Sequence, residues 1–233
     1  MRWHLFPKLS DIMTTLTLKK RIAIELVTLG LLTALFLLLF PHRPIYLDIT
    51  LALIALTLLA FNANFTKNVV WAQFPSCGNT HERFRSCLIK IAAMTFSLII
   101  LLLGMSVALT YQRKGSITYL QCLSNWHILI ALCLYFPWAL LQQTLFQFYL
   151  LGRLRTLLPS VAAITCTGIS YALVHLPDLE ITLATAAAGI FWTYLYNRYR
   201  YLIPLAFSHT VLGSIFYYCV YGIDLFENWI LFK

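Results

Sequence analysis

Long apolar runs alternate with short polar connections along most of the chain. Each run is close to the roughly 20 apolar residues that a helix needs to cross the hydrocarbon core. Barrel strands are shorter and alternate in polarity, whereas these runs are apolar on all sides. The pattern therefore predicts an all-α, polytopic transmembrane bundle of about seven spans, at about residues 22–40, 48–64, 89–110, 127–149, 160–176, 181–197 and 202–221.

Prolines mark most of the connections, but Pro137 falls inside the fourth predicted span. Because proline removes an interior hydrogen bond, a break at Pro137 is the alternative to one continuous helix. The run of small residues in 184–189 lets helices approach closely, and we interpret it as a packing face. We divide the chain into an N-terminal transmembrane region (1–125), a membrane core (126–221) and a short C-terminal tail (222–233).

Composition and charge agree with a membrane protein. Of the 233 residues, 61% are hydrophobic and 11% are charged, too few charges to solvate a soluble domain of this length. The net charge of +9 is better explained by Lys and Arg residues that orient a membrane protein than by nucleic-acid binding. We therefore predict no nucleic-acid partner. With the amino terminus inside, thirteen Lys and Arg residues lie on the inner side and four on the outer side. We therefore expect a multi-pass protein of a bacterial inner (plasma) membrane, with a cytoplasmic amino terminus.

The six cysteines favour free, reduced thiols. Cys122, Cys133, Cys166 and Cys219 lie in or beside apolar runs, where cysteine behaves as a small hydrophobe. Cys77 and Cys87 flank His81 in a polar loop, and a zinc site there is the alternative, although the spacing matches no established ligand pattern. We predict no metal and no cofactor.

Three glutamines lie inside the fourth predicted span, where polar groups are energetically expensive. Gln143 and Gln147 are four residues apart and share one helix face, whereas Gln142 points about 100° away. A single glutamine in a span usually bonds to a neighbouring helix. Three within six residues indicate a polar chamber instead.

Two histidines lie in later predicted spans. His175 follows Tyr171 by four residues near the outer end of the fifth span, where an interfacial position is the alternative to a functional one. His209 lies well inside the seventh span, four residues before Gly213, and a buried histidine there needs a polar partner. Taken with the glutamines, they raise the hypothesis of a water-filled, reactive chamber.

The order and spacing of these groups resemble the CPBP intramembrane protease family, which includes the type II CAAX prenyl endopeptidases and the abortive infection proteins. Its three motifs are E-E-x-x-x-R, F-x-x-x-H and H-x-x-x-N. The corresponding residues here are Gln142, Gln143 and Gln147; Tyr171 and His175; His209 and Gly213. The resemblance covers about residues 135–215. It departs from the family where glutamine replaces both glutamates and the arginine, and where glycine replaces the asparagine.

The resemblance implies that His175, with Gln142 or Gln143, activates water for attack on a peptide bond. It assigns oxyanion stabilisation to His209, with Gln147, Tyr171 and Gly213 in supporting positions. Glutamine binds a water molecule but cannot accept its proton, so His175 is left as the base. Gly213 offers no side-chain donor.

The resemblance also implies a lipid environment and membrane-protein or peptide substrates, including prenylated ones. Because every acidic group of the motifs is absent, a catalytically silent scaffold or regulator is the alternative. A small transporter is a third hypothesis, since a polar chamber would also serve transport. The sequence carries no indication of oligomeric state.

Overall fold

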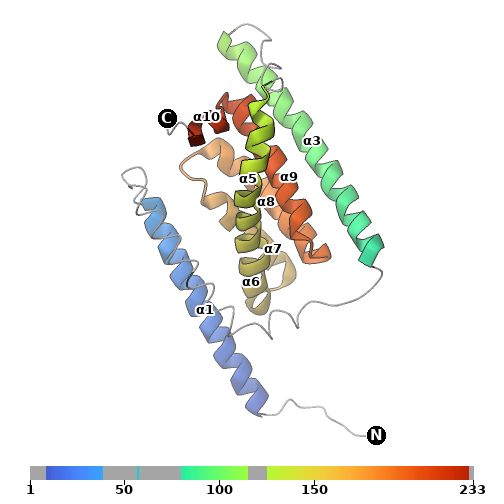
Figure 1. Cartoon of the computed structure of the whole chain (residues 1–233). Helices are drawn as coiled ribbons and strands as arrows, with labels where there is room; N and C mark the ends of the chain where they lie inside the picture. The colour runs from blue at the N-terminus through green and yellow to red at the C-terminus, as the bar shows by residue number, and fades with distance from the viewer. Residues whose placement is uncertain (1–8, 39–56, 58–79, 115–124, 231–233) are drawn as a thin grey trace. The chain divides into compact units, whose positions relative to one another are not determined.

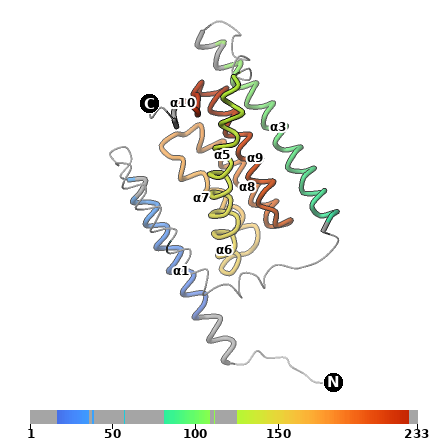
Figure 2. Tube along the Cα trace, in the orientation of Figure 1, coloured from blue at the N-terminus to red at the C-terminus, as the bar shows by residue number. Residues whose placement is uncertain are grey.

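The computed structural model describes residues 9–38, 57, 80–114 and 125–230 (Figures 1 and 2). These residues form helices and connections, and none of them forms a β-strand. The predicted all-α class is therefore confirmed. The second predicted span, at 48–64, and the residues Cys77 and Cys122 lie outside the described residues, so the zinc alternative at Cys77 is not tested.

The helices follow the predicted apolar runs. Their bounds are α1 (Leu9–Leu38), α3 (Thr80–Lys114), α5 (His127–Gln143), the π-helix η2 (Thr144–Leu150), α6 (Leu151–Leu157), α7 (Ser160–Leu173), α8 (Leu179–Tyr199), α9 (Leu202–Ile215), the π-helix η3 (Phe216–Tyr221) and α10 (Leu225–Ile230).

Three helical stretches in the described part of the chain are long and apolar enough to cross a membrane. They are His81–Ala108, His127–Leu157 and Leu202–Tyr221, and they overlap the third, fourth and seventh predicted spans. The helix Ser160–Leu173, in the fifth predicted span, is apolar but shorter. The membrane-helical class is confirmed, and the total of seven spans stays a prediction.

The alternative of a break at Pro137 is wrong. Helix α5 continues through Pro137 to Gln143, because one missing hydrogen bond is tolerated when the remaining bonds of the helix persist. The irregularity comes later, where η2 replaces the α-helical pattern from Thr144 to Leu150. π-helical turns are rare and frequently occur at functional sites. Here the π-helix begins directly after Gln143 and contains Gln147.

The chain divides into two compact units, and each is described by itself. In the described residues, the first unit comprises α1, α6, α7 and α8 up to Ile190. Arg153 on α6 donates to Glu25 on α1 at 3.2 Å, and the two side chains are 3% and 9% exposed. Gly168 on α7 and Ile190 on α8 approach so closely that a Cβ at Gly168 would lie 2.7 Å from the Ile190 backbone.

The predicted packing face on α8 contributes to this close approach. A Cβ on Gly189 would lie 3.0 Å from the Tyr171 ring and 3.2 Å from the Gly168 carbonyl oxygen. Small residues thus bring α7 and α8 together, as we expected for this stretch.

The second unit comprises α3, α5, η2, α8 from Phe191 onward, α9, η3 and α10. Helix α9 packs against both α5 and α3 (Figure 1). Ala131 and Ala139 on α5 and Ala206 on α9 are fully buried. Alanines at such positions let two helix backbones lie close to each other. The face of α5 on which Ala131 and Ala139 lie also carries residues of the candidate site.

The prediction of free thiols is confirmed for Cys87, Cys133 and Cys166. It is wrong for Cys219, which is fully buried and disulfide-bonded. The sequence reading failed because an apolar run makes cysteine look like a small hydrophobe, and pairing depends on which chain segment lies opposite.

Candidate active site

His209 lies buried between α9 and α5 in the second unit, with 4% of its surface exposed. Its Nε2 atom is 3.2 Å from the hydroxyl of Tyr135 on α5, and the two rings meet edge to face with centroids 5.5 Å apart. The Trp192 ring of α8 lies on the same histidine at 5.0 Å between centroids. The sequence predicts that a buried His209 needs a polar partner but does not say which residue it is. The structure shows that this partner is Tyr135.

A short chain of hydrogen bonds fixes the Trp192 ring beside His209. The indole Nε1 donates to the Ser208 hydroxyl at 3.1 Å, and that hydroxyl lies 2.7 Å from the hydroxyl of Thr95 on α3. Trp192 is 2% exposed and Ser208 is 1% exposed. Three helices therefore hold the surroundings of His209 in place.

Gly213 lies one turn beyond His209, and its missing side chain makes room for Tyr135. A Cβ at Gly213 would lie 2.5 Å from Cε1 and 3.1 Å from the hydroxyl oxygen of Tyr135. Real Cβ atoms do not approach other atoms so closely, so no other residue fits at position 213 unless the tyrosine moves.

One buried stripe runs along α5 and η2, and it consists of Ala131, Tyr135, Ala139, Gln143 and Gln147. Gln143 and Gln147 are both 0% exposed, whereas Gln142 is only half-buried. The predicted division of the three glutamines between two faces is thus confirmed. The stripe places the two buried amides on the side of the helix that also carries Tyr135.

The amide groups of Gln143 and Gln147 have no hydrogen-bond partner within the part of the chain that the structure describes. A buried, unsatisfied polar group costs about 1–3 kcal/mol, and buried amides in folded proteins normally pair with protein atoms or water. Four unsatisfied amide atoms on one face therefore indicate a place for water or a polar ligand. Each amide can donate and accept, but neither can take up a proton at neutral pH.

In the first unit, His175 follows the end of α7 and is half-buried. Its Nδ1 lies 3.0 Å from the Tyr171 carbonyl oxygen, and the two rings are 5.6 Å apart. A carbonyl oxygen only accepts, so this contact assigns the ring hydrogen to Nδ1. The lone pair of the neutral ring is then on Nε2, the atom that a general base would use. Tyr171 and His175 lie on one face, as their spacing predicted.

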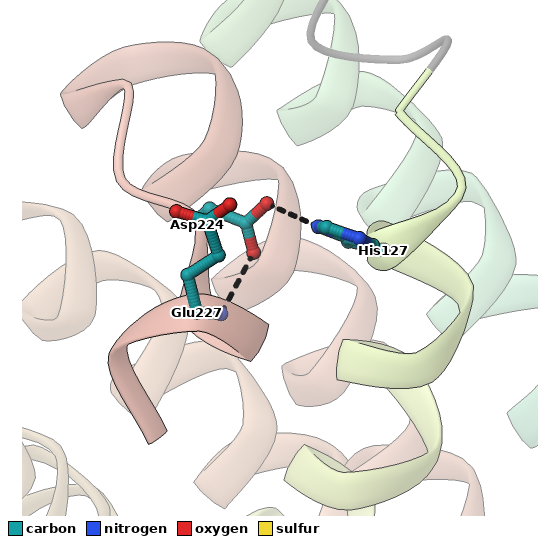
Figure 3. Close-up of side chains that lie close together, drawn as sticks. All are labelled: His127, Asp224 and Glu227. Carbon is teal, nitrogen blue, oxygen red and sulfur yellow. Dashed lines mark hydrogen bonds and ion pairs between the residues drawn. The ribbon is translucent and has the colours of Figure 1, made fainter. Parts of the chain in front are cut away.

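A polar cluster that the sequence analysis missed joins the start of α5 to the start of α10 (Figure 3). His127 Nδ1 lies 2.7 Å from Asp224 Oδ2, and the Glu227 backbone N–H donates to Oδ1 at 3.2 Å. Asn125 donates to Oδ2 at 2.9 Å and the Tyr218 hydroxyl to Oδ1 at 2.7 Å. Asp224 is therefore the N-cap of α10. The predicted tail (222–233) thus contains helix α10, and an aspartate three residues before a glutamate is a helix-start signal.

The same cluster contains ligand types that metals use. The side chains of His127, Asp224 and Glu227 bring one ligand atom each to within 4.8 Å of one another. Both oxygens of Asp224, however, already accept hydrogen bonds. Burial raises the pKa of the Asp224 carboxyl, but the bonds donated by Tyr218 and His127 and the further donors outweigh it and lower the pKa to about 2. The arrangement fits a structural cap better than a metal site.

Comparison with known proteins adds a family assignment to this geometry. No curated protein and no solved structure matches the chain. Residues 124–215 match the family model described as type II CAAX prenyl endopeptidase Rce1-like. The matched range includes the buried stripe, Tyr171, His175 and the α9 residues around His209. Residues 124–215 of this membrane protein are therefore similar to the Rce1-like type II CAAX prenyl endopeptidases.

Proposed function

We propose that this protein is a CAAX-protease-like intramembrane endopeptidase, which hydrolyses peptide bonds of membrane-associated or prenylated substrates. The observation that carries the proposal is the Rce1-like match over residues 124–215, the stretch that contains His175 and His209. The Tyr171 contact supports a role for His175 as base, because it leaves Nε2 with a free lone pair. The burial of His209 supports its assignment to the group that stabilises the oxyanion.

The proposed reaction is addition and elimination at the scissile carbonyl. The water oxygen bonds to the carbonyl carbon, the C=O electron pair moves onto oxygen, and His175 Nε2 takes the water proton. Collapse of this intermediate re-forms the C=O bond and breaks the C–N bond, and the imidazolium returns the proton to the leaving amine. General base catalysis contributes about 10²–10⁴-fold, so a site without the glutamates retains part of its rate.

Cleavage of a farnesylated C-terminal peptide tests this proposal. The protein is purified in detergent, and the products are measured by mass spectrometry. We expect slow cleavage by the parent protein and none by His175→Ala or His209→Ala. His81→Ala, at the start of α3, is the matched histidine control and should cleave like the parent. Cleavage that persists in both active-site variants contradicts the assigned roles.

A catalytically silent binding protein is the second candidate function, and one observation favours it. The buried amides of Gln143 and Gln147 can hold a polar ligand but cannot accept a proton. The double change Gln142→Glu with Gln143→Glu distinguishes the two functions. If cleavage appears only after this restoration, the natural chain binds without cutting; if the parent already cleaves, the silent alternative is excluded. A transporter has no specific observation in its favour.

A further inference from the structure

We propose that the Tyr135 hydroxyl is a catalytic hydrogen-bond donor to the oxyanion, and that it takes the place of the side-chain donor that Gly213 lacks. The inference rests on the proposed endopeptidase function and names a further residue of the same site. It starts from one contact, between the Tyr135 hydroxyl and His209 Nε2 at 3.2 Å.

The position of the Tyr135 ring is the first step. The ring edge fills the space that a side chain at position 213 would occupy, since Cε1, the hydroxyl oxygen and Cζ lie 2.5, 3.1 and 3.2 Å from an ideal Cβ there. A side chain at 213 would thus require the Tyr135 ring to shift. The phenol hydroxyl consequently lies where a residue on the turn after His209 would present its polar end.

The direction of the hydrogen bonds is the second step. His209 Nε2 and the phenol oxygen can exchange donor and acceptor roles, because each can do both. When Nε2–H donates to the phenol oxygen, the phenol O–H can rotate to donate to a third group. An oxyanion is a better acceptor than a neutral ring nitrogen, so negative charge on the substrate favours this arrangement. The contribution of His209 to oxyanion stabilisation then runs through Tyr135, whose phenol it positions and polarises.

The surroundings are the third step. Tyr135 is 8% exposed and lies in the closely packed interface of α5 and α9. In such a dry environment a fixed donor stabilises developing charge more than it would in water. The Trp192 ring also contacts His209, but its indole N–H donates to Ser208 at 3.1 Å. The Tyr135 hydroxyl contacts His209 Nε2 directly, so it is the donor that the proposal assigns to the oxyanion.

Removal of the hydroxyl alone is the decisive experiment. Tyr135→Phe keeps the ring that packs against Gly213 and loses only the donor. We expect kcat for the farnesylated peptide to fall by about 10²–10³-fold with little change in KM, as for the loss of one oxyanion donor. Tyr149→Phe is the matched control, because Tyr149 is another buried tyrosine on the same helical run, in η2. It should keep the parent kcat.

A donor exchange provides the second arm. Tyr135→Ala empties the space beside position 213, and adding Gly213→Asn places an amide donor in it. We expect the double variant to cleave faster than Tyr135→Ala alone. A double variant that is no faster contradicts the equivalence of the two donors.

The outcomes separate this inference from the proposed function. If the parent cleaves, His209→Ala does not, and Tyr135→Phe cleaves like the parent, the role of Tyr135 is overturned while the endopeptidase function stands. Equal losses in Tyr135→Phe and Tyr149→Phe also overturn it, because they indicate a general packing effect. A parent that does not cleave, with or without its histidines, overturns both proposals.

Discussion

At the residue scale, the most informative position is the glycine that departs from the family motif. Read from the sequence, Gly213 is a lost side chain; in the structure it is the position against which Tyr135 packs. The spacing of His209 and Gly213 was predictable because it is local. The approach of Tyr135 was not, since it joins residues 74 positions apart and depends on how α5 and α9 pack.

Gly213→Ala should therefore lower stability. The added methyl group would lie 2.5 Å from Tyr135 Cε1 and force the ring aside. Overpacking of this kind costs about 1–3 kcal/mol, measurable as a lower thermal unfolding midpoint in detergent. Gly104→Ala in α3 is the matched control, because nothing lies within 4 Å of its new Cβ. Equal midpoints for the parent and Gly213→Ala would show that Tyr135 has room to move.

At the element scale, hydrophobic periodicity predicted the helices well and their irregularities poorly. The run around Pro137 was correctly read as apolar and helical, and the faces of Gln142 and Gln143 follow from 3.6 residues per turn. The π-helix from Thr144 to Leu150 has no signature in a single sequence, because its shifted hydrogen bonds depend on neighbouring helices.

The ion pair between α1 and α6 is a test of how these elements hold together. Arg153→Met removes the ion pair with the Glu25 carboxylate, and breaking a buried pair costs about 3–5 kcal/mol. The double variant Glu25→Leu with Arg153→Met should recover most of that loss, because neither charge remains. Unfolding midpoints of the three proteins, with Arg155→Met as control, measure the difference. A double variant as unstable as Arg153→Met would contradict the pairing.

The N-cap of α10 should make the free energy of unfolding depend on pH in the acidic range. The hydrogen bonds to Asp224 lower its pKa from the ordinary 3.8 to about 2 in the folded protein. A carboxyl with a lowered folded-state pKa contributes stability above about pH 4, and loses that contribution as the pH falls toward 2. Asp224→Asn should flatten this part of the stability profile, whereas Glu227→Gln, at an exposed position, should leave it unchanged. Parallel profiles for the parent and Asp224→Asn would refute the cap.

At the scale of the whole molecule, the sequence predicted the membrane class and the region that is similar to the Rce1-like family. It did not predict which segments of the chain contact each other. The three motifs fall in two compact units, with Tyr171 and His175 in one and Gln143 and His209 in the other. The local geometry of each motif is set by helix spacing. Contacts such as His209 with Tyr135 and the disulfide of Cys219 depend on tertiary packing, for which one sequence has no signal.

The orientation in the membrane can be argued from two independent features of the last span. Arg198 and Arg200 precede α9, on the side that the distribution of Lys and Arg predicts to be the inner one. Cys219 lies near the other end, at residue 18 of the 20-residue stretch Leu202–Tyr221. Disulfides persist in oxidising compartments, so its disulfide agrees with an outer position. We expect protease added to spheroplasts to remove a C-terminal tag and to spare an N-terminal tag until the cells are opened. Early loss of the N-terminal tag would reverse the orientation.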